Sequence, residues 1–170
     1  MSKGHIVNRI ERLRKEMAKT GTDAFVAVTD ESFNWETLYY LSGFRGTSGA
    51  LVIYKDSAEL ILDGRYREQG ETQSPRPVLA QKNSLTDDVI DSISAHGAEK
   101  ILCEASKTSH ATWEKLASAK KTRWCDATPV ISELRRSKDG HEAECIIKAG
   151  EIAAEAFSLT LESVMPGMTE

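Results

Sequence analysis

The residues best suited to ligand binding lie in the glycine-rich stretch GFRGTSG, residues 43–49. Glycines let a backbone approach a bound molecule closely. Phe44 would add an apolar wall, and Arg45 a fixed positive charge suited to gripping a carboxylate. The structural alternative is a loop that needs glycine conformations as the chain enters a strand, and both interpretations stay open. The GxxGxxG spacing matches neither the dinucleotide-binding nor the P-loop motif.

A second stretch with chemical potential is LDGRY, residues 62–66. Asp-Gly after a strand is typical of a turn. Asp63 and Arg65 can pair with each other or order a neighbouring loop, which favours a structural role over catalysis. Arg65 nevertheless joins Phe44 and Arg45 as a candidate substrate-binding residue.

The sequence shows no complete catalytic or metal-binding arrangement. Ser48 lies in GTSGA, but Ala50 replaces the last glycine of a nucleophile elbow, and the stretch leads into a strand. The four histidines form neither HExxH nor His-x-His. No CxxC occurs among the three cysteines, which favours unpaired thiols in a reducing cytoplasm. We therefore assign no catalytic residue and no metal ligand to this chain.

The first half of the chain predicts a helix, a strand and a hairpin around these stretches. Ile6, Ile10, Leu13 and Met17 recur at helical spacing, and Gly21 is a natural end of that helix. A buried strand is predicted at 23–28 and a short helical turn at 36–41. Two apolar runs separated by three turn-forming residues predict a β-hairpin, at 50–54 and 58–63.

The second half alternates strand and helix patterns, which indicates parallel strands. Together with the hairpin, this predicts an α/β fold: a mixed β-sheet with a hairpin and parallel strands, flanked by helices. A long C-terminal helix is predicted from about Gly140 to Val164, opened by an Asp139–Glu142 capping box. Its apolar face is larger than the α/β unit requires, so we expect a further partner for it.

Size and charge favour a soluble globular protein. The chain has 170 residues, 40% hydrophobic residues and a formal net charge of −4. Its basic residues are mostly scattered, which argues against nucleic acid as a partner. No apolar run approaches the roughly 20 residues of a membrane span, and the N-terminus lacks the apolar core of a signal peptide. We predict an α/β domain at 1–128 and a linker with a further helix at 129–170.

Three stretches together resemble one family. YYLSGFRGTSGALVI is similar to a family pattern Tyr-Leu-x-Gly-Phe-x-Gly-Ser-x-Gly, and AELILDGRYREQG contains the Asp-Gly-Arg-Tyr that follows the hairpin. The run from LRRSKDG to PGMTE resembles the junction between two domains in the same family. In this order, the stretches resemble the N-terminal domain of the aminopeptidase P, prolidase and creatinase family over nearly the whole chain.

The resemblance implies a non-catalytic N-terminal domain that shapes substrate access and dimer contacts. In the family, catalysis belongs to a following "pita-bread" domain. Two Asp, one His and two Glu there hold two divalent metal ions, usually Mn or Co, which activate water for hydrolysis of an Xaa-Pro bond. The implied partners are this catalytic domain, a second subunit in a homodimer and an Xaa-Pro peptide, in the cytoplasm. We expect none of the metal ligands within this chain.

One departure leaves the substrate open. Arg45 occupies a position where the aminopeptidases commonly carry Thr, and creatinase-like members use an aromatic residue and an Arg on the substrate carboxylate. A creatinase or prolidase relative is therefore one alternative. A complete, non-enzymatic module that binds a peptide or carboxylate is another. The stretch ESVMPGMTE, with helix-stop and helix-start signals in succession, favours a junction to a further domain.

Overall fold

The computed structural model describes residues 3–30, 34–119 and 121–169. The chain forms two compact units, Met1–Arg136 and Ser137–Glu170. This division follows Arg136, whereas the boundary predicted from the sequence lies at residue 128. Helix α6 (Thr128–Arg136) belongs to the first unit because Ile131 and Leu134 are buried in its core.

The first unit contains a mixed sheet of six strands among its described residues, in the order β4-β3-β2-β1-β5-β6. Strands β1–β2 and β2–β3 pair antiparallel, whereas β3–β4, β1–β5 and β5–β6 pair parallel. The predicted hairpin and the predicted parallel strands are thus confirmed. The strands are β1 Ala24–Asp30, β2 Ser48–Tyr54, β3 Ala58–Leu62, β4 Val78–Ala80, β5 Lys100–Cys103 and β6 Arg123–Asp126.

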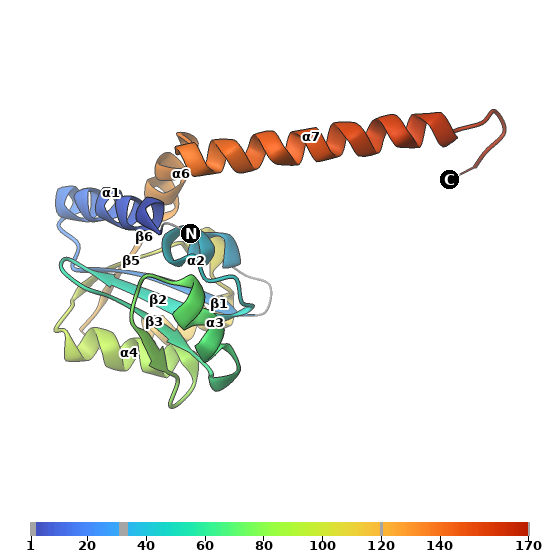
Figure 1. The fold of residues 1–170 in the computed structure, drawn as a ribbon. Helices are drawn as coiled ribbons and strands as arrows, with labels where there is room; N and C mark the ends of the chain where they lie inside the picture. Colours follow the sequence, from blue (N-terminus) through green and yellow to red (C-terminus); the bar gives the residue numbers. More distant parts are fainter. Residues whose placement is uncertain (1–2, 31–33, 120, 170) are drawn as a thin grey trace. The chain divides into compact units, whose positions relative to one another are not determined.

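Helices cover both faces of this sheet, as Figure 1 shows for α1 and α2 on one side and α4 on the other. Strand β1 accordingly alternates: Phe25 and Ala27 face one cluster of buried side chains, and Val26 faces the other. Burial on both faces explains why these strands read as continuous apolar runs. The helices of this unit include α1 Gly4–Thr20, α2 Trp35–Ser42, α3 Arg67–Gln73, α4 Leu85–Ala95 and α5 His110–Ala117.

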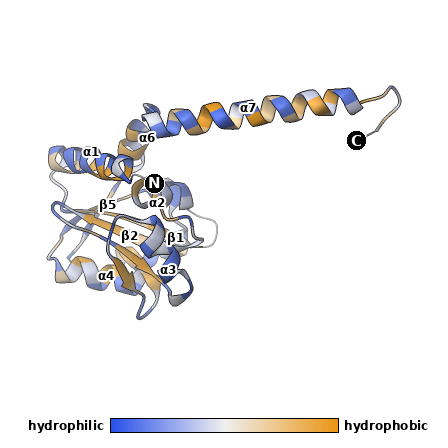
Figure 2. Ribbon diagram, viewed as in Figure 1, coloured by the Kyte–Doolittle hydropathy of each residue, from blue (hydrophilic) through white to orange (hydrophobic). Residues whose placement is uncertain are grey.

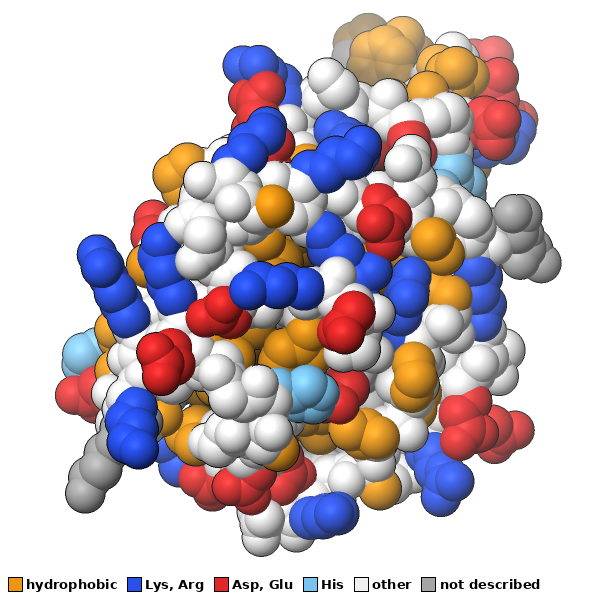
Figure 3. All heavy atoms as spheres, turned by 90° about the vertical axis from the view of Figure 1, so that its left-hand side faces the viewer, with side chains coloured by type: hydrophobic (Ala, Val, Ile, Leu, Met, Phe, Trp, Pro, Cys, Tyr) orange, Lys and Arg blue, Asp and Glu red, His pale blue; other side chains and the backbone are white. Residues whose placement is uncertain are grey.

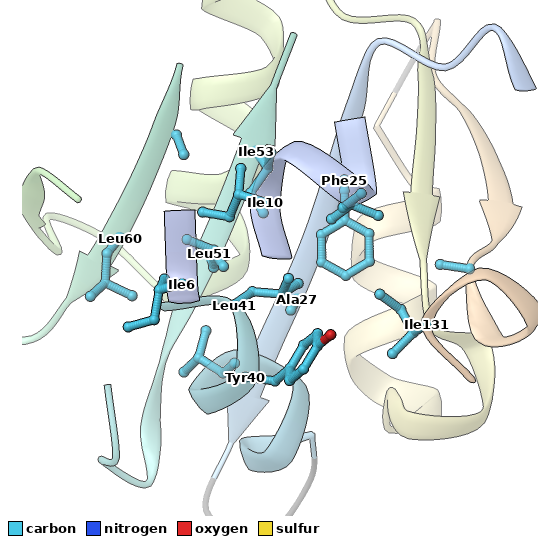
Figure 4. Close-up of a cluster of buried hydrophobic side chains, with 14 of the residues drawn as sticks. Ile6, Ile10, Phe25, Ala27, Tyr40, Leu41, Leu51, Ile53, Leu60 and Ile131 are labelled. Carbon is cyan, nitrogen blue, oxygen red and sulfur yellow. The ribbon is translucent and has the colours of Figure 1, made fainter. Parts of the chain in front are cut away.

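The larger cluster lies between the sheet and helices α1, α2 and α6 (Figure 4). Ile6 and Ile10 of the predicted α1 face are 3% and 0% exposed. Gly21 ends α1 with a left-handed φ of 61°, as its position in the sequence predicted. The smaller cluster lies under α4 and α5 and includes Val89 and Leu116.

The second unit consists mainly of helix α7, Gly140–Ser163. The predicted capping box is present: Asp139 accepts from the Glu142 backbone N–H, and the Glu142 side chain accepts from that of Asp139. No residue of α7, which is described along its whole length, is buried. Figure 2 shows apolar residues distributed along it, and Ile147 and Phe157 are 63% and 65% exposed.

Charged side chains of both signs are interspersed on the face shown in Figure 3, with hydrophobic side chains visible between them. This mixture agrees with a net charge of only −4. The absence of nucleic acid among the partners stays a prediction. Among the described helices, none is sufficiently long and apolar to cross a membrane.

Candidate functional site at the glycine-rich loop

The glycine-rich loop connects α2 to β2 and passes close to two other helices. Gly43 adopts a left-handed φ of 77°, and a Cβ there would lie 2.6 Å from Ile6 Cδ1 and 2.9 Å from the Gln73 carbonyl oxygen. Both the conformation and the lack of space require glycine at this position. The loop is thereby held against α1 and α3.

The later glycines of the loop make room for buried side chains. A Cβ on Gly46 would overlap the Phe44 ring and lie 2.7 Å from its Cε1, and one on Gly49 would lie 2.5 Å from Leu62 Cδ2. Phe44 is 0% exposed and contacts Tyr66 edge to face, with ring centroids 5.6 Å apart. The ring is therefore a core side chain that supports the loop. It does not form the solvent-facing wall that the sequence suggested, and a role in substrate binding would be indirect.

Arg45 is an exposed side chain of this loop, as is Thr47. Its backbone N–H donates to Gln73 Oε1 at 2.8 Å, which fixes the loop to α3. Its guanidinium lies 6.0 Å from the ring centroid of Trp35, which is 40% exposed. No carboxylate of the described residues pairs with Arg45, so its guanidinium can donate hydrogen bonds to an anionic ligand. Substrate binding by Arg45 stays a prediction.

Arg65 lies in the second candidate stretch and pairs with Asp63, as the sequence suggested. Arg65 Nη2 lies 2.7 Å from Asp63 Oδ2, and the Arg65 backbone N–H donates to Asp63 Oδ1 at 2.8 Å. The hydrogen bond from Arg65 lowers the pKa of the Asp63 carboxyl. Asp63 thereby caps the short 3-10 helix Gly64–Tyr66. The pairing favours a structural role, and substrate binding by Arg65 also stays a prediction.

Tyr66 brings the two stretches together. Its ring contacts Phe44, and its hydroxyl lies 2.9 Å from the hydroxyl of Thr47. The glycine-rich loop and the DGRY turn therefore form one surface region, although they lie apart in the sequence. The sequence identified both stretches but gave no indication that one tyrosine joins them.

Among the described residues, no His or carboxylate side chain is hydrogen-bonded to Ser48 or Cys103. Ser48 is the first residue of β2 and faces Asp30 in the strand register. Cys103 is buried, and this burial raises the pKa of its thiol to about 11. A thiol with that pKa is protonated at neutral pH and is a poor nucleophile. In the described part of the chain, no three His, Cys, Asp or Glu side chains come together as a metal site would require.

A buried polar cluster near the carboxyl end of β5 was not foreseen from the sequence. Glu104, Asn34 and Thr37 are 4%, 1% and 1% exposed, and each has at least one side-chain atom without a hydrogen-bond partner among the described residues. Burial raises the pKa of the Glu104 carboxyl, while the positive charges of Arg135 and Lys107 oppose that rise. Glu104 follows an apolar strand, and an isolated acid in that position carries no sequence signal of burial.

The profile of the Creatinase/Prolidase N-terminal domain matches residues 9–137 of this chain. This match covers most of the chain and includes both candidate stretches. The chain therefore belongs to the Creatinase/Prolidase N-terminal domain family.

Sequence relatives include full-length peptidases. The uncharacterized peptidase YqhT of Bacillus subtilis is 25% identical over 166 residues, which is 95% of this chain and 45% of YqhT. A probable Xaa-Pro aminopeptidase P of Laccaria bicolor is 34% identical over 93 residues, 49% of this chain and 14% of that protein. The chain thus spans less than half the length of these relatives.

Solved structures share the fold. An Xaa-Pro dipeptidase from Bacillus anthracis has a TM-score of 0.86 at 26% identity, covering 97% of this chain and 45% of that one. An X-Pro aminopeptidase from Thermotoga maritima has a TM-score of 0.86 at 27% identity, covering 95% and 45%. The N-terminal domain of the cytoplasmic peptidase PepQ from Mycobacterium tuberculosis has a TM-score of 0.66 at 28% identity, with 98% of that chain covered. The predicted fold class and family are confirmed.

Proposed function

We propose that this chain acts as the non-catalytic N-terminal domain of a metal-dependent Xaa-Pro aminopeptidase-like peptidase. The match of the family profile to residues 9–137 carries the proposal. The names of the relatives give the reaction class, and the chain spans 45% of YqhT and of the B. anthracis dipeptidase. Hydrolysis of the Xaa-Pro bond would belong to a catalytic domain outside these residues. The N-terminal domain formed by the present chain would shape substrate access and contribute dimer contacts.

The proposed peptidase would use two divalent metal ions, Mn or Co, to activate water. The described residues of this chain do not fit such a pair, because they contain no cluster of three or more candidate ligands. We therefore assign the metal ions to the catalytic domain and no step of the hydrolysis to this chain. The cytoplasm is the proposed compartment, supported by the description of the PepQ relative as a cytoplasmic peptidase.

The exposed apolar surface of α7 supports a catalytic domain as partner. Ile146, Ile152 and Leu161 are between 56% and 57% exposed, in a helix that buries no residue of its own. Most of the stability of a helix in a protein comes from packing of its apolar face. Large exposed apolar surfaces typically mark interaction sites. We propose that α7 packs within the catalytic domain.

A complete, non-enzymatic binding module is the second candidate function. The exposed Arg45 guanidinium, which has no carboxylate partner among the described residues, favours it, since such a group can bind a peptide carboxylate. The gene sequence beyond the codon for Glu170 distinguishes the two candidates. We expect an open reading frame that supplies two Asp, one His and two Glu at family-like spacing. A natural stop codon there would favour the binding module.

The role of Arg45 also separates an aminopeptidase from a creatinase or prolidase relative. In the full-length protein, we expect Arg45→Thr to raise KM for the preferred substrate, because a charge on the substrate loses its partner. Steady-state kinetics on creatine, Xaa-Pro dipeptides and longer Xaa-Pro peptides would identify that substrate. Unchanged KM and kcat in the variant would remove Arg45 from the substrate site.

A further inference from the structure

A pocket on the opposite face of the sheet from α1 is unrelated to the glycine-rich loop. It lies between α4 and strands β3 and β4, at the sheet edge that β4 forms. Its volume is about 380 Å³, within the range of small-molecule sites. Its walls are largely apolar, formed by aliphatic side chains from both strands and from α4: Ile61, Leu79, Ala80 and Ala95.

Carboxylates outnumber the lysine among the charged groups at this pocket. Glu59, Asp88 and Asp91 line it together with the single lysine Lys82. Asp88 is already engaged, since it accepts from the backbone N–H groups of Lys82 and Asn83. The Asp91 side chain, on helix α4, forms no hydrogen bond or ion pair with the residues that the structure describes. The pocket therefore combines an aliphatic floor with excess negative charge.

Glu59 is held in place by a chain of hydrogen bonds. It shares a face of β3 with Ile61, so the strand places a carboxylate where an apolar side chain is usual. Ser92 Oγ donates to Glu59 Oε2 at 2.6 Å, and the Tyr54 hydroxyl, 2.6 Å from Ser92 Oγ, must then donate to Ser92. Burial, with the nearby Glu59 charge, raises the pKa of Tyr54 to about 12, which keeps this hydroxyl a donor.

The other oxygen of Glu59 retains hydrogen-bonding capacity. Among the described residues, its nearest partner is His96 Nε2 at 3.7 Å from Oε1, a distance that permits an ion pair when His96 is protonated but is beyond hydrogen-bond distance. His96 is itself fixed, because its ring stacks on Tyr54 and its Nδ1 donates to the Ser92 carbonyl at 2.9 Å. Oε1 is thus an oriented acceptor at the wall of the pocket.

We propose that this pocket binds a small aliphatic primary amine, with its ammonium group between Glu59 and Asp91 and its carbon chain on Ile61 and Leu79. An ammonium group supplies three donors and a positive charge, matching two carboxylates with open acceptor positions. The aliphatic side chains of the floor favour a chain of several carbons. This site does not depend on the proposed peptidase function.

Titration of the ¹⁵N-labelled 170-residue chain at low salt tests the proposal. The probes are n-pentylamine, its uncharged analogue 1-pentanol and the anion pentanoate. We expect saturable amide shifts confined to β3, β4 and α4 with pentylamine, at a Kd in the millimolar range, the usual range for so small a ligand. Pentanol should bind at least about two-fold more weakly, and pentanoate should cause no saturable shift. Equal affinity of amine and alcohol would overturn the proposal.

Three variants test separately the carboxylate charge and the free volume of the pocket. Asp91→Asn should weaken pentylamine about two- to five-fold, which is the range for an exposed ion pair. Ala95→Leu should abolish saturable binding by filling the pocket, with dispersed amide signals as the check on folding. Asp56→Asn removes an exposed carboxylate on the β2–β3 turn, outside the pocket, and should leave Kd unchanged.

Unchanged affinity in Asp91→Asn, or an equal loss in Asp56→Asn, would contradict the assignment. If Ala95→Leu does not fold, the alcohol comparison and Asp91→Asn decide.

Discussion

At the scale of single residues, the glycine-rich loop is explained by the ring that it covers. Gly43 needs its left-handed conformation, whereas Gly46 leaves space for Phe44 and Gly49 for Leu62. The motif that looked most like a ligand-binding loop is therefore, in large part, a packing motif. What remains for binding is the exposed guanidinium of Arg45.

Substitution of Gly46 tests this packing explanation. Gly46→Ala should lower the free energy of unfolding by about 1–3 kcal/mol, because the added Cβ overlaps the Phe44 ring. The control is Gly64→Ala, where a Cβ would meet no atom within 4 Å and φ is not left-handed. Urea denaturation of both variants gives the comparison. Equal stability of Gly46→Ala and the wild type would show that the ring does not need this space.

The buried carboxyl of Glu104 predicts a pH dependence of stability. Its pKa is raised in the folded state, so the folded protein binds its proton more tightly than the unfolded chain does. This group therefore favours folding most at low pH, and the contribution falls as pH rises from the unfolded value of about 4.3 through the raised folded value. As pH rises through that window, the free energy of unfolding should fall less for Glu104→Gln than for the wild type.

Denaturation of both proteins between pH 3 and pH 8 measures this difference. The stability of Glu104→Gln relative to the wild type should rise with pH through the window. Glu133→Gln, which changes an exposed carboxylate on α6, is the control and should show a much smaller trend. A relative stability of Glu104→Gln that stays constant or falls with pH would contradict the burial argument.

At the scale of elements, the sequence predicted the local structure well and the long-range packing poorly. The buried face of α1, the extent of α7, the capping box at Asp139 and the β2–β3 hairpin depend on neighbouring residues, so periodicity and turn chemistry predict them. The inclusion of α6 in the first unit depends on contacts of Ile131 and Leu134 across the whole fold, which no local pattern indicates.

The same distinction applies to the candidate site. Glycine and arginine patterns identified both loops, but the burial of Phe44 and its contact with Tyr66 result from tertiary packing. The polar cluster at Glu104 and the pocket beside Glu59 are assembled from separate elements. No local pattern distinguishes those acids from surface carboxylates.

The capping box of α7 gives a prediction at the level of one helix. Asp139→Ala should remove the acceptor for the Glu142 N–H and cost about 1 kcal/mol of helix stability. Amide hydrogen exchange across the first turn should accelerate accordingly. Glu155→Ala, in the exposed middle of the same helix, serves as the control. Similar exchange at the first turn in both variants would mean that the box does not stabilise α7.

At the scale of the whole molecule, an α/β unit of a known family is joined to a helix whose apolar side chains are exposed. The family match ends at residue 137, where the second unit begins. The exposed apolar residues of α7 and the relatives' greater length support the same proposal. In that proposal, the first unit is accessory and the helix belongs with the catalytic partner.

A two-armed hydrolysis assay tests this account most directly. The purified 170-residue chain and the full-length protein are each supplied with Mn²⁺ and an Xaa-Pro peptide. We predict cleavage of the Xaa-Pro bond by the full-length protein and none by the 170-residue chain, because the proposed metal ligands lie outside it. Robust Mn²⁺-dependent cleavage by the 170-residue chain alone would contradict the account.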